Sequence, residues 1–220
     1  MSKHSKVIVF DLDGTITQRD TYLPFLFGLL LRRPWIIYRL IGLPIAVVIH
    51  VTRMRSNTWL KKVFLKAFMK GMTQDQVCEW IELFADRVVS TGLREGAVSE
   101  LNKHIDAHAC VLLVSASLDI YANRIGDKLG VHATLCTEVE WDENGQLTGG
   151  LKTENCYGQE KIVRLQKWLK QHGAEVVSVA YSDHHSDIPL LSFAEMGVAV
   201  SPSKKLAGII HSSQLKLVHW

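Results

Sequence analysis

Hydrophobic residues follow two kinds of pattern along this chain of 220 residues. Short continuous apolar runs, typical of strands buried on both faces, start with Val7–Phe10 and recur at 110–114, 133–139, 175–180 and 198–200. Helical patterns alternate with these runs at 97–108, 119–129, 159–172 and 188–194, and the unit repeats once more over 202–210 and 215–218. The alternation predicts an α/β protein with three layers around a mostly parallel sheet.

The segment 18–94 contains no strand pattern. Leu60, Phe64 and Phe68 follow helical spacing with lysines on the opposite face, and Thr73–Gln76 is a capping box that starts a further helix. We therefore expect a helical cap over 18–94, inserted after the first strand of a core that comprises 1–17 and 95–220. An Asn-Gly pair at 144–145 predicts a hairpin turn within that core.

The charge distribution singles out the same cap. The chain has a net charge of +3, but residues 21–74 hold nine Lys or Arg and no Asp or Glu. The apolar runs 22–31 and 34–51 are interrupted by prolines and are shorter than the roughly 20 residues that a membrane span needs. We expect packed helices here, while contact of residues 21–56 with an anionic membrane surface stays open. The lysines lack aromatic stacking partners, so we expect no nucleic-acid partner.

The four cysteines have no metal-ligand spacing, which favours reduced thiols and a cytoplasmic protein. The first residues lack a signal-peptide pattern. A peripheral position on the inner face of the membrane is compatible with the basic, apolar cap. The oligomeric state is left open by the sequence.

Polar residues cluster where the predicted strands end. In a parallel sheet these ends share one edge, which therefore gathers Asp11, Asp13, Ser115, Lys161, Asp183 and Asp187. Each residue alone could be a helix cap, a turn or a surface side chain. Together the carboxylates need a cation, since two unit charges about 4 Å apart repel by roughly 4 kcal/mol at an effective dielectric near 20. Oxygen ligands favour Mg²⁺, and the set as a whole suits phosphoryl transfer.

Four stretches carry a resemblance to a known family: Asp11-Leu12-Asp13-Gly14-Thr15, Val114–Ser117, Lys161 and Ser182–Asp187. In order and spacing they resemble the four motifs of the haloacid dehalogenase superfamily. The order of parts, with a C1-type cap after the first motif, looks most like the phosphoserine-phosphatase branch, subfamily IB. The stretches 145–149 and 155–161 are similar to that branch as well.

The resemblance implies a role for each motif residue. Asp11 would be the nucleophile that forms an aspartyl-phosphate, and Asp13 the general acid and base. Mg²⁺ would be held by Asp11, the backbone carbonyl of Asp13 and Asp183, with Asp187 acting from just outside or through water. The phosphoryl group would be bound by Thr15, Ser115, Ala116 and Lys161.

Two departures from phosphoserine phosphatases leave the substrate open. The fourth motif lacks their usual Gly-Asp-Gly start and reads Tyr181-Ser182-Asp183-His184-His185-Ser186-Asp187, which leaves the roles of both histidines undecided. The cap is unlike one built for a small amino acid, although Asp20, Arg53 or Arg55, and Ser186 are candidates for substrate contact. The expected substrate is a small phosphorylated metabolite such as phosphoserine, or a lipid phosphate. The alternatives are a membrane-associated phosphatidylglycerophosphate phosphatase, a phosphomutase and an aspartyl-phosphate signalling module.

Overall fold

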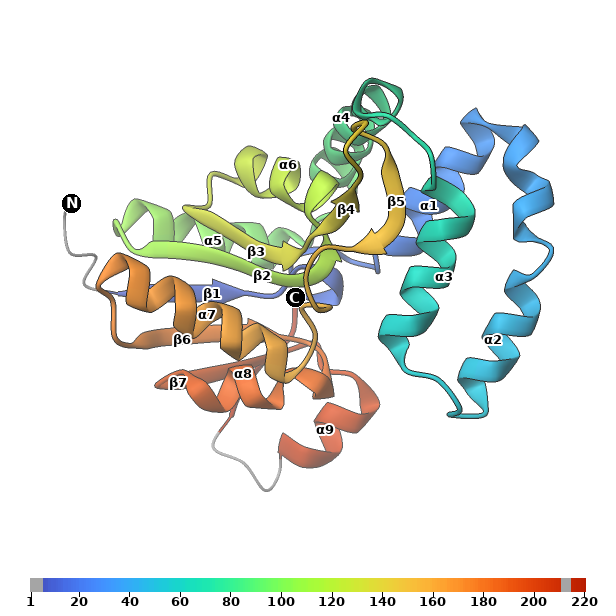
Figure 1. Ribbon diagram of the computed structural model, residues 1–220. Coiled ribbons are helices and arrows are strands. Elements are labelled where there is room, and N and C mark those ends of the chain that lie inside the picture. The colour runs from blue at the N-terminus through green and yellow to red at the C-terminus, as the bar shows by residue number, and fades with distance from the viewer. Residues whose placement is uncertain (1–5, 211–214) are drawn as a thin grey trace.

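A six-stranded parallel sheet forms the centre of the computed structural model, which describes residues 6–210 and 215–220 (Figure 1). Its order is β3-β2-β1-β6-β7-β8, and every neighbouring pair is parallel. The strands are β1 (Val7–Phe10), β2 (Cys110–Leu118), β3 (Ala133–Thr137), β6 (Val177–Ser182), β7 (Met196–Val200) and β8 (Lys216–Val218). The predicted α/β fold with a mostly parallel sheet is confirmed. The strand order reverses direction between β1 and β6, where α/β proteins of this type bind ligands.

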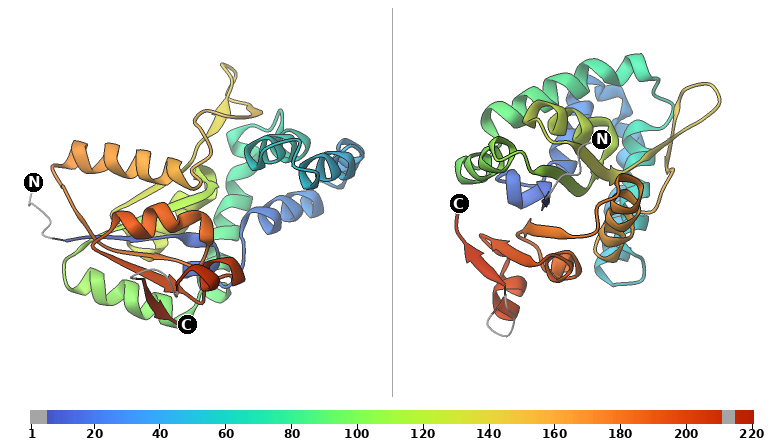
Figure 2. Two further views of the ribbon diagram at one scale, coloured as in Figure 1. Left: turned by 90° about the horizontal axis from the view of Figure 1, so that it is seen from below. Right: turned by 90° about the vertical axis from the view of Figure 1, so that its left-hand side faces the viewer.

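Helices cover both faces of the sheet (Figure 2). Ile8 and Phe10 of β1 pack in a cluster with side chains of α5 (Glu95–Asp106) and α6 (Asp119–Leu129). Val7 and Val9 face the other way, toward α7 (Gln159–His172), α8 (Ile188–Phe193) and α9 (Lys204–Ile210). The alternation of β1 side chains between two apolar layers explains why the strand is apolar at all four positions.

The segment after β1 is helical, as the pattern predicted. It comprises α1 (Tyr22–Arg32), the 3₁₀ helix η2 (Pro34–Leu40), α2 (Leu43–Val51), α3 (Asn57–Met69) and α4 (Gln74–Thr91). Gln76 accepts a hydrogen bond from the Thr73 N–H at 3.2 Å, at the start of α4. That helix packs along α6, with Phe84 edge-on to Tyr121 at 5.4 Å between ring centroids. Because α4 runs from the cap onto the sheet-covering layer, a single cap over 18–94 stays a prediction.

The prediction of a single strand over 133–139 is wrong at its C-terminal end. β3 stops at Thr137, and β4 (Val139–Trp141) pairs antiparallel with β5 (Leu147–Leu151) as a separate hairpin. Val139 and Leu147 are buried, and β5 packs against α3. The chain leaves the sheet after Thr137 because β4 pairs with β5, which packs against the cap helix α3. Conversely, β2 continues beyond the expected 114 to Leu118, and Ser115 and Ser117 lie where its register with β3 shifts, between Val114 and Leu118.

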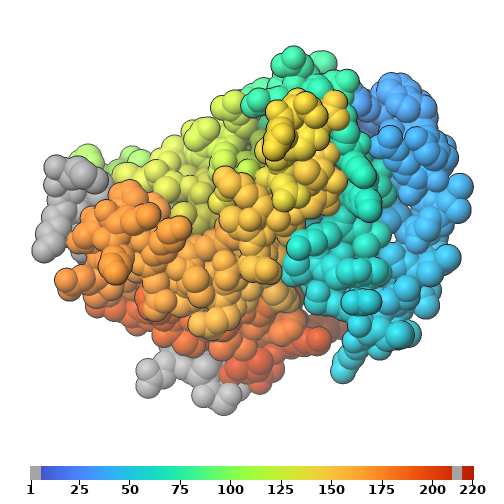
Figure 3. All heavy atoms as spheres, in the orientation of Figure 1, coloured from blue at the N-terminus to red at the C-terminus, as the bar shows by residue number. Residues whose placement is uncertain are grey.

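The η2–α2 segment lies farthest from the sheet, at the right-hand edge of Figures 1 and 3. Within η2 and α2 the buried side chains are Ile36 and Ala46. Among the described residues no single helix has the length and apolar character to cross a membrane, although η2 and α2 together meet those criteria with a 45° bend between them.

Candidate active site

A cavity of about 890 Å³ lies at the carboxyl edge of the strands, between the sheet and the cap helices. Its core side is lined by Asp11, Asp13, Ser115, Lys161, Asp183 and Asp187, as the strand-end argument predicted. Its cap side is lined by residues of α1, α2 and α3. The tertiary structure therefore brings all six residues to one place.

Lys161 links two of the carboxylates. Its Nζ lies 2.6 Å from Asp11 Oδ1 and 2.6 Å from Asp187 Oδ2, and all three side chains are buried. Ser182 also donates to Asp187 Oδ2, at 2.7 Å. Burial raises the pKa of Asp11, which the Lys161 ammonium opposes and the Asp187 carboxylate reinforces. Burial lowers the pKa of Lys161, but the two carboxylates outweigh it and raise that pKa, so the lysine stays charged.

A hydroxyl group connects Asp11 to the fourth motif. Thr15 Oγ1 lies 3.4 Å from Asp11 Oδ2 and 3.2 Å from Asp183 Oδ1, and it accepts a hydrogen bond from the Asp183 N–H at 3.0 Å. Gly14 has a φ of +78°, and a Cβ there would lie 2.5 Å from Asp183 Oδ2. Glycine is therefore required both by the left-handed backbone and by the close approach of the Asp183 carboxylate.

This donor set fits a hard divalent cation. Within residues 6–210 and 215–220 no three His, Cys, Asp or Glu side chains are arranged to hold a metal ion. The carboxylates of Asp11 and Asp183 both lie within hydrogen-bond distance of the Thr15 hydroxyl, and the backbone at Gly14 lies close to Asp183. This arrangement suits Mg²⁺, which binds one or two carboxylates and keeps several waters. Burial raises the pKa of Asp183, as it does for Asp11, so a cation between them would favour the charged forms.

Asp13 is held on the cap side of the site. Its Oδ1 accepts from the N–H and the hydroxyl of Thr21, at 2.8 and 2.7 Å, and its Oδ2 accepts from Ser117 Oγ at 2.5 Å. Burial, with the Asp20 carboxylate nearby, raises the pKa of Asp13 against these hydrogen bonds. A raised pKa favours the protonated form of the carboxyl group, which is the form that can serve as a general acid.

The serine segment at the end of β2, residues 115–117, is fixed by a residue that the sequence did not single out. Lys61 of α3 reaches from the cap and donates to the Ala116 carbonyl at 2.6 Å and to Asn155 Oδ1 at 2.7 Å. Thr137 donates to the same two oxygens. Burial lowers the pKa of Lys61 to about 8. In the sequence Lys61 is one of four lysines on the polar face of a helix, and no local signal separates it from Lys62.

Of the four residues predicted to contact the substrate, two line the cavity and two do not. Asp20 lines the cavity, but its Oδ1 accepts from the N–H of Tyr22 at 2.9 Å and so caps α1. Ser186 also lines it and is hydrogen-bonded to His184 Nδ1 at 2.7 Å. Arg53 and Arg55 are exposed between α2 and α3 and are not among the residues that line the cavity. Their predicted substrate contact is therefore not supported by their position, because the loop that carries them faces outward.

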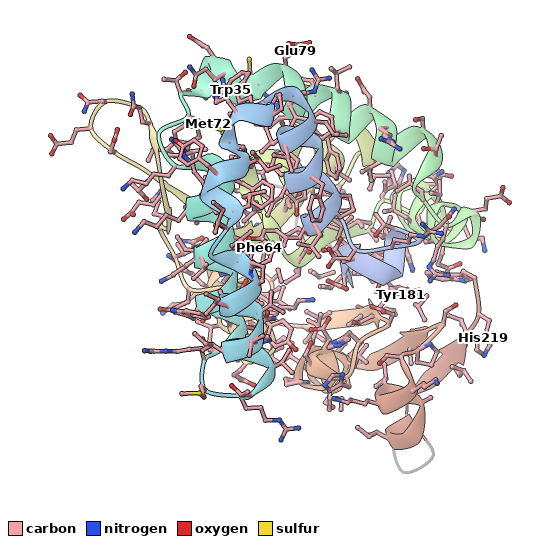
Figure 4. All side chains as sticks on the ribbon, turned by 90° about the vertical axis from the view of Figure 1, so that its right-hand side faces the viewer. Trp35, Phe64, Met72, Glu79, Tyr181 and His219 are labelled. Carbon is pink, nitrogen blue, oxygen red and sulfur yellow. The ribbon has the colours of Figure 1, made fainter. Side chains whose placement is uncertain are left out.

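The cap side of the cavity is largely apolar. Its apolar residues are Leu23, Pro24, Val47, Leu60 and Phe64, contributed by α1, α2 and α3, and polar side chains such as Asn57 and Lys61 lie among them. Figure 4 looks onto these helices from the cap side, with Phe64 labelled. The cavity thus joins a charged floor at the sheet edge to an apolar wall in the cap.

The protein is therefore an α/β protein with an acidic site at the carboxyl edge of its parallel sheet, covered by helices that follow the first strand. Residues 8–192 match the family described as haloacid dehalogenase-like hydrolase, so the chain belongs to that family. The resemblance drawn from the four motifs is thereby confirmed, together with the expected class of enzyme.

Curated relatives extend over most of the chain. The protein CicA of Caulobacter vibrioides (strain NA1000 / CB15N) is 28% identical over 205 residues, which is 89% of this chain and 86% of that protein. The phosphoserine phosphatase SerB1 of Mycobacterium tuberculosis (strain ATCC 25618 / H37Rv) is 25% identical over 206 residues, which is 91% of this chain and 66% of that protein.

Solved structures share the fold. A protein of unknown function from Bordetella pertussis Tohama I superposes with a TM-score of 0.82 at 22% identity, covering 98% of this chain and 99% of that one. A phosphoserine phosphatase solved as a phospho-aspartyl intermediate analogue gives a TM-score of 0.66 at 20% identity, covering 98% and 94%. Within its family, the chain is thus similar to phosphoserine phosphatases in sequence and in fold.

Proposed function

We propose that this protein is a Mg²⁺-dependent hydrolase of phosphate monoesters that acts through an aspartyl-phosphate on Asp11. The observation that carries the proposal is the setting of the Asp11 carboxylate, which lies at the cavity floor between the Lys161 ammonium and the Thr15 hydroxyl. A buried carboxylate flanked by a cation and a donor is suited to attack a phosphoryl group whose charge these neighbours offset.

The reaction then has two steps. In the first, an Asp11 oxygen forms a bond to phosphorus, the bond from phosphorus to the ester oxygen breaks, and Asp13 gives its proton to the departing alkoxide. In the second, Asp13 removes a proton from water, the water oxygen bonds to phosphorus, and the bond to Asp11 breaks to release inorganic phosphate. Lys161, the Ser115 hydroxyl and the backbone at Ala116 would hold the phosphoryl oxygens.

Mg²⁺ would be held by Asp11, Asp183 and the backbone carbonyl of Asp13. When bound, it supplies positive charge that polarises the phosphoryl group and offsets the excess of carboxylates. Asp187, which is engaged by Lys161 and Ser182, would set the position of the lysine rather than take a place on the metal.

The cavity favours a substrate with an apolar alcohol part, and a lipid phosphate such as phosphatidylglycerophosphate is the first candidate. The support is the wall of Leu23, Val47, Leu60 and Phe64 facing the charged floor. Phosphoserine is the second candidate, because Asp20 lines the same cavity and could face an ammonium group.

The test compares the wild-type protein with Asp11→Asn and with Asp106→Asn, an exposed aspartate at the end of α5. Phosphate release is measured from a chromogenic aryl phosphate, phosphoserine and a lipid phosphate, with Mg²⁺ or with a chelator. We expect turnover by Asp11→Asn to be lower than wild type by about a thousandfold or more, and turnover by Asp106→Asn to equal that of wild type.

Acid-quenched protein analysed by mass spectrometry should carry phosphate on Asp11 during turnover. Undiminished Mg²⁺-dependent activity in Asp11→Asn would refute the assignment. Transfer of the phosphoryl group back to a second hydroxyl of the substrate would identify a phosphomutase instead. A phosphoenzyme stable for hours would identify a signalling module.

A further inference from the structure

The outer surface of the cap is made of apolar side chains that face solvent. We define the docking face as the exposed apolar residues of η2, α2 and the turn after it. These side chains are 61% to 78% exposed: Trp35, Ile37, Tyr38, Ile41, Ile45, Val48, Val51 and Met54. Outside residues 23–54, the most exposed large hydrophobic side chain in the described part of the chain is Val163, at 52%. The apolar surface is therefore concentrated on one segment.

The composition of α2 explains why its own packing leaves so much uncovered. The helix reads LPIAVVIHV, with His50 as its polar side chain, and of its nine residues Ala46 is buried. A helix that is apolar on every side normally lies inside a protein or in lipid, since its exposed faces are unfavourable in water. The docking face consequently needs a partner that covers it.

The charges around this face select the kind of partner. Arginines stand at both ends and at the middle of the segment, at Arg32, Arg33, Arg39, Arg53 and Arg55, and residues 21–74 contain no acidic side chain. In residues 6–210 and 215–220, Arg32 pairs with Glu79 at 3.8 Å, whereas the other four form no ion pair with a carboxylate. The rim of the face is thus positively charged and available to an anionic surface.

A second copy of the chain is disfavoured by the same charges. In a two-fold dimer the patch would meet itself, which would place arginines opposite arginines with no carboxylate from either segment. A bilayer with anionic headgroups offers both an apolar layer and negative charge. Trp35 and Tyr38 belong to the aromatic residues that concentrate at the boundary between lipid and water, and arginines lie over both rings.

We propose that the docking face rests on the surface of an anionic lipid bilayer, with η2 and α2 lying in the plane of the headgroups. The 45° bend and the short lengths of the two helices suit an in-plane position. Figure 4 views the molecule from the side that would meet the bilayer, with Trp35 labelled at the upper end of the face.

The same helix borders the candidate active site. Val47 lines the cavity, while Val48 and Val51 on α2 belong to the exposed face. Helix α2 would therefore lie between the bilayer and the cavity. In this arrangement the phosphate group of a membrane lipid would lie close to the site. This delivery of substrate rests on the proposed function, whereas the docking itself does not.

The experiment is flotation of the full-length protein with lipid vesicles in a density gradient. One set of vesicles is phosphatidylcholine, and the other contains about a third phosphatidylglycerol. The protein is also tested at low and at high salt, because screening at 1 M salt shortens the Debye length from about 10 to about 3 Å. We expect flotation with the anionic vesicles to exceed that with neutral vesicles at least about tenfold, and high salt to weaken it.

A double variant tests the face itself. Ile41→Glu with Val48→Glu places two carboxylates on the docking face without touching residues that line the cavity. The matched control is Val163→Glu with Val176→Glu, two half-exposed valines elsewhere on the surface. We expect the first pair to lower flotation at least about tenfold and the control pair to leave it unchanged, since burial of each apolar side chain contributes about a tenfold factor or more. Turnover of the aryl phosphate should be the same in both.

Three results would overturn the docking. One is normal turnover of the aryl phosphate without flotation. Another is retention of the protein in vesicles after alkaline carbonate washing, which would indicate a span rather than surface contact. The third is a dimer in solution that the Ile41→Glu, Val48→Glu pair dissociates. Failure of the proposed function would appear separately, as absence of Asp11-dependent turnover whatever the flotation result.

Discussion

Replacing Lys161 with methionine removes the cation that pairs with both Asp11 and Asp187 while keeping a side chain of similar length. Each of the two contacts is 2.6 Å long. At that distance and an effective dielectric near 20, each attraction amounts to about 6 kcal/mol. Most of this attraction offsets the cost of burying three charged groups. The expected loss in the free energy of unfolding is therefore about 3–5 kcal/mol, the range for removal of one partner of a buried ion pair.

The loss of stability in Lys161→Met should grow as the pH increases. Burial already raises the pKa of Asp11 above its ordinary value of 3.8, and Lys161 opposes that rise. Without the lysine the pKa of Asp11 rises further, and the folded variant then binds more protons than the unfolded chain above pH 3.8. Its stability therefore falls as pH increases from about 4 through neutrality. The deficit relative to wild type is expected to be larger at pH 8 than at pH 5.

The assay is urea unfolding at both pH values in the presence of a metal chelator. Lys167→Met serves as the control, because Lys167 is an exposed lysine on the same helix, and it should change stability by less than about 0.5 kcal/mol. The reasoning is refuted if Lys161→Met costs no more than Lys167→Met at pH 8, or if its deficit is the same at pH 5.

Three further substitutions have expected outcomes. Gly14→Ala should lower turnover at least about a hundredfold, since the added Cβ would lie 2.5 Å from the Asp183 carboxylate in a left-handed backbone; a steady-state assay that finds normal turnover would contradict this. Lys61→Met should lower kcat/KM about tenfold or more and Lys62→Met should not, because Lys61 holds the serine segment of β2 whereas Lys62 is exposed; equal kinetics for the two variants would contradict this role of Lys61. Arg94→Lys should lower kcat about tenfold with little change in KM, because the arginine Nε donates to the Gly14 carbonyl at 3.1 Å and steadies the turn that follows Asp11 and Asp13; unchanged kcat would contradict this, and thermal melting shows whether the variant still folds.

The sheet and its acidic edge were predictable because their signals are local. Val7–Phe10 is apolar at consecutive positions, which marks a strand buried on both faces, and Asp11 follows it directly. Since parallel strands end at one edge, Ser115, Lys161 and Asp183 could be placed beside Asp11 without knowledge of their contacts. The family resemblance then supplied roles that geometry alone could not assign.

The end of the third strand was not predictable from its own residues. Thr137 and Val139 have strand character, but a strand pattern does not say which partner each residue pairs with. β3 pairs with β2, whereas β4 pairs with β5, which packs against α3. The partner is decided by distant apolar surface, which a periodic pattern does not contain.

Sequence by itself determined the alternation of strands and helices, the position of the helical insert and the set of strand-end residues, because each depends on local spacing. Only the tertiary structure decided which of several similar lysines enters the site: Lys61 reaches Ala116, 55 positions away, while Lys62 stays in solvent. The tertiary structure also decided that α2 exposes its apolar side chains and that Arg53 and Arg55 face outward. These outcomes depend on contacts between residues far apart in the chain, for which neighbouring residues carry no signal.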